Sequence, residues 1–118
     1  GALVARGRIR DRFAHLVQVS EFRSVAADEL WLSPAYGRDS VALHFTWVKD
    51  QAGVTAVLPL IEAVLAQFDA RPHWGKVFTL PPATVRDRYP RWAQFAALAD
   101  RLDPRGKLRN PMLRPYFE

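Results

Sequence analysis

The sequence predicts an α+β fold: a mostly antiparallel sheet with helices on one face, followed by further helices at the C-terminal end. Two segments, residues 16–26 and 41–48, alternate their side chains with the period of a β-strand. Residues 54–68 and 92–102 instead repeat their apolar side chains at helical spacing. Segments of these two kinds, joined by short turns, pack as a helical layer against a sheet.

A short helix is expected to lead into the first strand. Ile9, Phe13 and Leu16 recur at helical spacing in the segment RGRIRDRFAHL. From Leu16 to Ala26 the period changes to two, and both faces of the resulting strand carry polar as well as apolar side chains. This strand therefore has no purely apolar face for the core.

The second strand has one wholly apolar face, formed by Val41, Leu43, Phe45 and Trp47. Such a face needs a covering layer, and the amphipathic helix predicted over residues 54–68 is expected to supply it. Pro59 leaves two starting points open for this helix. Either Thr55 caps it, with Pro59 in its first turn, or it starts near Asp50 and kinks at the proline.

PHWGKVFT, residues 72–79, is expected to form a third strand, which completes the order β-β-α-β. Pro81-Pro82 follows and is the best internal boundary, so the chain divides into residues 1–80 and 81–118. The helix at 92–102 is expected to end at the turn Asp103-Pro104-Arg105-Gly106.

Composition limits the classes of function. A length of 118 residues with 49% hydrophobic side chains allows one core. The absence of cysteine excludes disulfides, Cys-ligated zinc and iron–sulfur clusters, and it agrees with a reducing compartment. The three histidines lack metal-ligand spacing, and no apolar run is long enough to cross a bilayer. We therefore expect a cytoplasmic protein with no metal and no membrane partner.

The positive charge is concentrated near the C-terminal end. Residues 1–80 carry nine basic and eight acidic side chains, whereas residues 81–118 carry eight and four, for a net charge of +5. A basic tail on a balanced domain is typical of a solvated face or a docking surface for another domain. No nucleic-acid-binding motif accompanies the charge, so we expect no nucleic-acid partner.

Glu21 and Arg23 lie two residues apart in the first predicted strand. Their side chains therefore leave the same face, roughly 6.6–6.8 Å apart along the chain. An ionised carboxylate only accepts hydrogen bonds and a guanidinium only donates them, so the pair matches two neighbouring hydroxyl groups of a polyol. The alternative is an ordinary surface ion pair.

His44, Thr46 and Lys76 are further candidates. His44 and Thr46 lie on the face of the second strand opposite its apolar side, where they could line one cavity with the first strand. Lys76 follows Gly75, whose lack of a side chain allows a ligand to approach, and it can place a positive charge where negative charge develops. The alternatives are a core histidine, a threonine favoured by β-propensity and a surface lysine.

Four segments of the chain resemble, in order, the C-terminal region of the alditol oxidases: SEFR at 20–23, DELWLSPAYGRDSVALHFTW at 28–47, RPHWGK at 71–76 and YPRWAQFAALADRLDPRGKLRN at 89–110. These FAD-dependent sugar-alcohol oxidases belong to the vanillyl-alcohol-oxidase-type flavoproteins and are related to the aldonolactone oxidases. The family oxidises a primary alcohol of its substrate by hydride transfer to flavin, and the reduced flavin converts O₂ to H₂O₂.

The resemblance implies roles for all five candidate residues. Glu21, Arg23, Thr46 and Lys76 fall on positions that contact the polyol, and His44 lies beside them in the same cavity. Lys76 and Arg23 are expected to stabilise the negative charge that develops during the reaction, which makes them the catalytic pair. Glu21 and Thr46 are expected to orient the substrate hydroxyl groups.

The resemblance also assigns the two parts of the chain. Residues 1–80 correspond to the C-terminal half of a substrate-binding cap domain, and residues 81–118 to a helical segment that packs on an FAD-binding domain. Nothing in the chain matches that FAD-binding domain, so we expect a fragment that is inactive alone and whose partners are the missing domain, a polyol and O₂. An aldonolactone oxidase and a non-catalytic polyol-binding fragment are the alternative interpretations.

Overall fold

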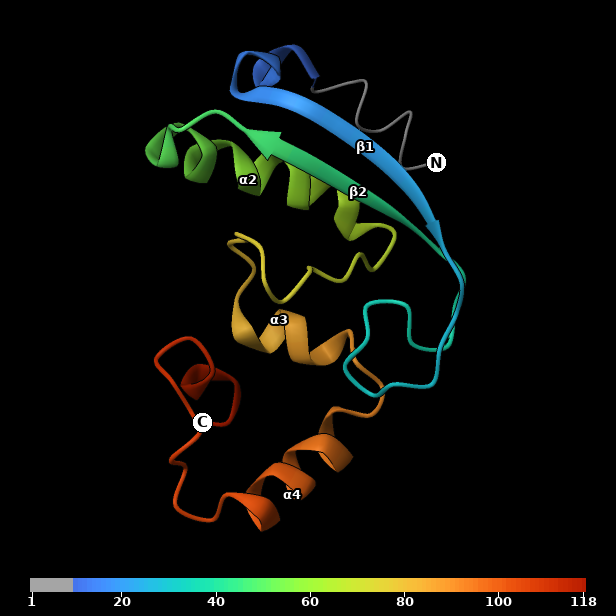
Figure 1. Ribbon diagram of the computed structural model, residues 1–118, viewed down its shortest axis with the longest axis vertical. Helices are drawn as coiled ribbons and strands as arrows, with labels where there is room; N and C mark the ends of the chain where they lie inside the picture. Colours follow the sequence, from blue (N-terminus) through green and yellow to red (C-terminus); the bar gives the residue numbers. More distant parts are fainter. Residues whose placement is uncertain (1–9) are drawn as a thin grey trace.

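The computed structural model describes residues 10–118 (Figure 1). It confirms the α+β class, with a two-stranded antiparallel sheet accompanied by helices. The elements follow in the order η1 (Arg10–Arg12), η2 (Ala14–Leu16), β1 (Val17–Val25), β2 (Ser40–Trp47), α2 (Gln51–Ala66), α3 (Pro82–Asp87), α4 (Trp92–Leu102) and η3 (Arg114–Tyr116). The predicted N-terminal helix is represented by the 3-10 turns η1 and η2, and its residue Ile9 lies outside the described residues.

β1 and β2 pair in an antiparallel register that places Glu21 opposite His44 and Arg23 opposite Ala42. An irregularity between Val17 and Val19 adds one residue to β1. Because residues directly opposite each other share a face of the sheet, the four polar candidates of the two strands lie together on one face. The apolar side chains of β2 lie on the other face.

The apolar face of β2 packs against aromatic and aliphatic side chains from two segments, one that precedes β1 and one that follows β2. The buried ring of Phe13 contacts Phe45, with the ring centroids 5.7 Å apart, and Trp47 at 6.2 Å. α2 runs beside β2 (Figure 1), and its Val54 lines a cleft together with Trp47. The predicted covering role of this helix is therefore confirmed.

α2 starts at the earlier of the two predicted positions. The Asp50 carboxylate accepts a hydrogen bond from the Gly53 N–H at 2.9 Å and so caps the helix, while Pro59 lies inside it. Thr55 is not the cap: its hydroxyl donates to the Gln51 carbonyl at 2.8 Å. The aspartate thereby satisfies one of the backbone donors that the first turn of a helix leaves without an intrahelical partner.

The third predicted strand, residues 72–79, is wrong. The segment forms a turn at Trp74–Lys76 and then an irregular stretch that belongs to neither strand of the sheet. Its anchors are side chains rather than a neighbouring strand: the Trp74 indole N–H donates to the Leu32 carbonyl at 3.1 Å, and the Thr79 N–H donates to the Glu62 carboxylate at 2.6 Å. The apolar side chains that suggested a strand, among them Trp74 and Phe78, instead pack against the C-terminal core.

The C-terminal part forms a second core around Val85, Tyr89 and Tyr116, which are 0%, 2% and 5% exposed. The aromatic rings of Trp74 and Trp92 pack against it. α4 matches the predicted helix at 92–102, whereas α3 was missed. Pro82, the second proline of the pair at the predicted boundary, is the first residue of α3, where proline is well tolerated.

Among residues 10–118, no helix is both long and apolar enough to cross a lipid bilayer.

Candidate functional site

The polar face of the hairpin centres on the Glu21 carboxylate. Its Oε2 accepts a hydrogen bond from Arg23 Nη2 at 3.0 Å and lies 2.8 Å from His44 Nδ1. Because an ionised carboxylate can only accept, the imidazole donates from Nδ1 in this contact. One carboxylate is thus held between a guanidinium of its own strand and an imidazole of the neighbouring strand.

These three side chains remain accessible to solvent. The side chains of Glu21, Arg23 and His44 are 40%, 64% and 34% exposed. The His44 hydrogen bond, and then the Arg23 hydrogen bond and charge, lower the pKa of Glu21 below its ordinary value. The carboxylate is therefore ionised at neutral pH, and each of the three groups can reach a ligand on the open side of the sheet.

Thr46 lies on the same face, opposite Val19, and its side chain is exposed. Val19 and Val25, which are 52% and 39% exposed, flank the polar groups on β1. Both valines lie an even number of residues from Glu21, so the alternation of a β-strand places them on the same face. The face therefore combines hydrogen-bonding groups with apolar surface, an arrangement that suits a ligand with hydroxyl groups on a carbon chain.

Lys76 lies apart from the sheet, in the turn that follows Trp74. Its backbone N–H donates to the His73 carbonyl at 3.0 Å, and the side chain is exposed. Within the part of the chain that the structure describes, the Lys76 side chain makes no hydrogen bond or ion pair. The structure thus brings Glu21, Arg23 and His44 into contact, with Thr46 on their face, and does not join Lys76 to them.

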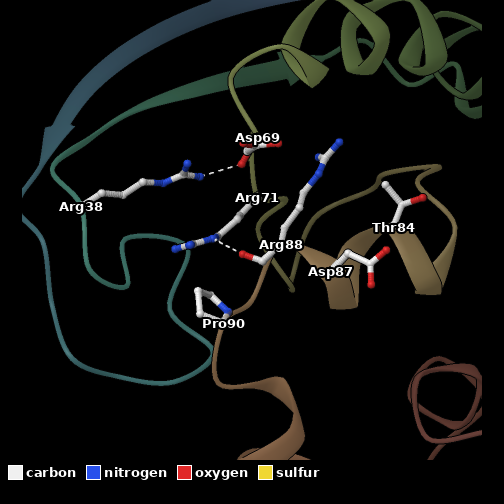
Figure 2. A pocket seen from close by; sticks show the side chains of 7 residues that line it. All are labelled: Arg38, Asp69, Arg71, Thr84, Asp87, Arg88 and Pro90. Carbon is white, nitrogen blue, oxygen red and sulfur yellow. Dashed lines mark hydrogen bonds between the residues drawn. The ribbon is translucent and has the colours of Figure 1, made fainter.

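A second polar region, not expected from the sequence, is a cleft of about 470 Å³. Three arginines contribute to its lining (Figure 2), together with acidic, hydroxyl and proline side chains: Arg38, Arg71, Arg88, Asp69, Asp87, Thr84 and Pro90. Arg71 donates to the backbone carbonyls of Arg88 and Tyr36 at 2.7 and 2.8 Å. Its guanidinium also lies over the Tyr89 ring, 5.3 Å from the centroid.

The other two arginines also donate to backbone carbonyls. Arg38 donates to the carbonyls of Phe68 and Asp69, and Arg88 donates to that of Ala70. Burial, and then the charge of Arg38, lower the pKa of Arg71. These guanidiniums join the loop between the strands, the end of α2 and the start of the C-terminal part. We interpret the cleft as a structural junction.

Comparison of the sequence with known proteins shows the family of this chain. The D-arabinono-1,4-lactone oxidase family matches residues 10–116. The chain is 58% identical over 117 residues to the alditol oxidase of Streptomyces sp. (strain IKD472 / FERM P-14339). It is 39% identical over 100 residues to the L-gulono-1,4-lactone dehydrogenase of Mycobacterium tuberculosis, and 31% identical over 124 residues to a long-chain alcohol oxidase of an uncultured marine euryarchaeote.

The three alignments cover 99%, 81% and 100% of the chain but only 28%, 22% and 26% of the respective relatives. The chain thus spans about a quarter of the length of the curated relatives it matches. The match to the family nevertheless includes both strands, the three α-helices and all five candidate residues. The chain therefore belongs to the D-arabinono-1,4-lactone oxidase family.

Proposed function

We propose that this chain forms part of the substrate-binding region of an FAD-dependent oxidase that acts on the primary alcohol of alditols such as xylitol and sorbitol, with O₂ reduced to H₂O₂. The observation that carries the proposal is the Glu21–His44–Arg23 cluster on the open face of the hairpin. Its support is the 58% identity to an alditol oxidase over 99% of the chain.

The cluster offers a polyol both kinds of hydrogen-bonding group. A hydroxyl group donates and accepts, so one hydroxyl can donate to Glu21 while its neighbour accepts from Arg23. Thr46 can do either, and it follows His44 by two residues along β2. An extended polyol presents successive hydroxyl groups along a line, as the two strands do, whereas a lactone ring is compact. This geometry favours the open chain.

Lys76 and Arg23 are the cations of the proposed mechanism. A positive charge held near the reacting oxygen stabilises the negative charge that develops on this oxygen as the alcohol loses its proton. Lys76 suits this role because its ammonium group has no partner within residues 10–118 and remains available. Arg23, bound to Glu21, holds and orients the substrate as well.

The described residues do not provide a cradle for the FAD pyrophosphate. Their two positive-φ glycines, Gly37 and Gly106, lie in turns and neither opens a helix, as the glycines of a phosphate-binding loop do. Because the chain spans 28% of its alditol oxidase relative, we assign FAD binding to the rest of the full-length protein and expect these 118 residues alone to be inactive. When bound, the flavin supplies the acceptor for the hydride.

The test is a comparison of kcat/KM for xylitol and for a five-membered aldonolactone in the full-length protein, with H₂O₂ formation as the measurement. We expect xylitol to be preferred. Glu21→Gln should reduce that preference, because the amide replaces one of the two acceptor oxygens that a polyol hydroxyl group can donate to with a hydrogen-bond donor. Better turnover of the lactone, or an unchanged ratio in Glu21→Gln, would contradict the proposed specificity.

An aldonolactone oxidase is the second candidate. The family description and the relative from Mycobacterium tuberculosis, 39% identical over 81% of the chain, both name lactones. The same comparison of substrates separates the two oxidases. A non-catalytic polyol-binding fragment would instead bind xylitol in the 118-residue chain, in calorimetry, with no contribution from other sequence.

A further inference from the structure

The stretch after Lys76 is fastened to α2 by one carboxylate. Glu62 lies in the second half of the helix, and its Oε1 accepts the Thr79 backbone N–H at 2.6 Å. Its Oε2 accepts the Thr79 hydroxyl at 2.5 Å. Hydrogen bonds to an ionised carboxylate are roughly twice as strong as neutral ones, and two of them on one residue also fix its orientation.

The stretch before Lys76 is fastened to a different layer. The Trp74 indole N–H donates to the Leu32 carbonyl, and its ring lies 5.5 Å from that of Tyr89 and 5.3 Å from that of Tyr116, centroid to centroid. Lys76 therefore lies between an anchor in the C-terminal core and an anchor on α2. A three-residue separation spans at most about 10 Å of extended chain, so Thr79 restricts where the Lys76 backbone can lie.

The side chain of Lys76 contributes nothing to holding this position. It is exposed and has no hydrogen bond or ion pair to any other described residue. Along residues 77–80, Thr79 supplies the one backbone hydrogen bond recorded for the described residues, and Phe78 and Leu80 pack against the C-terminal core. The two hydrogen bonds of Thr79 to Glu62 therefore link this stretch to α2, while its apolar side chains and Trp74 link it to the C-terminal core.

We propose that Glu62 and Thr79 are positioning residues, which hold the turn so that the Lys76 charge meets the reacting oxygen; this inference rests on the proposed function. Among residues 10–118, the recorded hydrogen bonds of Thr79 all go to Glu62, which belongs to the helix on the apolar side of the sheet. They act through Lys76 rather than on the substrate. A misplacement of the charge reduces stabilisation of the transition state more than it reduces binding of the ground state.

The first test uses single variants of the full-length protein with xylitol. Thr79→Val removes the hydroxyl donor, and Glu62→Gln removes the charge and one acceptor. We expect either to lower kcat about 10-fold with little change in KM, since small misplacements of a catalytic group reach effects of this size. Thr79→Ser keeps both donors and should restore the parent kcat. Thr55→Val is the matched control, because Thr55 bonds only within α2.

The second test repeats Thr79→Val and Glu62→Gln in a Lys76→Met background. If both residues act through Lys76, neither should lower kcat further there, because the interaction they serve is already lost. Reductions that multiply in the Lys76→Met background would show a merely structural role and overturn the inference. So would a normal kcat in Thr79→Val when Lys76→Met is impaired. A normal kcat in Lys76→Met would instead overturn the proposed function of the lysine itself.

Discussion

The open face of the hairpin and the C-terminal core use the same kinds of side chain in opposite ways. On the hairpin, the Arg23 side chain is 64% exposed and bonds to a carboxylate that is itself reachable. At the C-terminal core, Arg71 donates to backbone carbonyls and covers the ring of Tyr89, which is 2% exposed. Burial raises the pKa of Tyr89 to about 12, so its phenol stays neutral.

This difference separates binding groups from structural groups. A guanidinium whose donors are taken up by main-chain carbonyls has few left for a ligand, whereas Arg23 shares one carboxylate and keeps most of its donors free. Substitutions in the first region should therefore change substrate selectivity with little loss of stability. Substitutions in the second should change stability with little effect on the folded enzyme's turnover.

The largest expected effect is on the aromatic core. Tyr116→Ala should lower the free energy of unfolding by about 3–5 kcal/mol, because it leaves a cavity among Trp74, Trp92 and Tyr89. Urea denaturation followed by tryptophan fluorescence measures the loss. Tyr116→Phe keeps the ring and is the control, with an expected loss below about 1 kcal/mol. Equal losses in both variants would mean that the hydroxyl, not the ring, stabilises this core.

A smaller effect is expected at the arginine junction. Arg71→Lys keeps the charge but cannot reach the separate carbonyls of Arg88 and Tyr36 together, so it should cost about 2 kcal/mol of stability. Arg23→Lys, at the exposed pair, should cost less than about 0.5 kcal/mol. The same urea titration compares them. A loss in Arg23→Lys as large as that in Arg71→Lys would erase the proposed distinction between the two regions.

The smallest effect concerns the acid titration of Glu21. Because its folded pKa is lowered, its contacts with His44 and Arg23 are fully formed above the ordinary value of 4.5 and are lost as the pH falls through the folded pKa. His44→Phe and Arg23→Leu should each raise the pKa of Glu21 in an NMR titration of labelled glutamate. Thr46→Val, on the same face, should leave it unchanged. If the pKa of Glu21 were unaltered in both His44→Phe and Arg23→Leu, the proposed contacts of Glu21 with these two residues would be contradicted.

Local patterns predicted the elements whose environment is uniform. The strand at 41–48 and the helix at 92–102 each have one consistently apolar side, and both form within two residues of the expected bounds. Residues 72–79 lack such a uniform environment. Trp74 and Phe78 pack against the C-terminal core while Thr79 bonds to α2, so a largely apolar segment formed no strand. α3 was missed because its six residues, which begin with the second proline of the Pro-Pro pair, carry too little periodicity to detect.

The sequence by itself determined that Glu21 and Arg23 share a face, as do His44 and Thr46, because alternation along a strand is a local property of the backbone. Only the tertiary structure decided that Glu21 meets His44, 23 residues away, since that contact depends on the register between the strands. It also decided that the Trp74 indole N–H donates to the carbonyl of Leu32, 42 residues away, and that the Arg71 guanidinium donates to main-chain carbonyls. Such contacts join segments that no local period relates, so packing alone sets them.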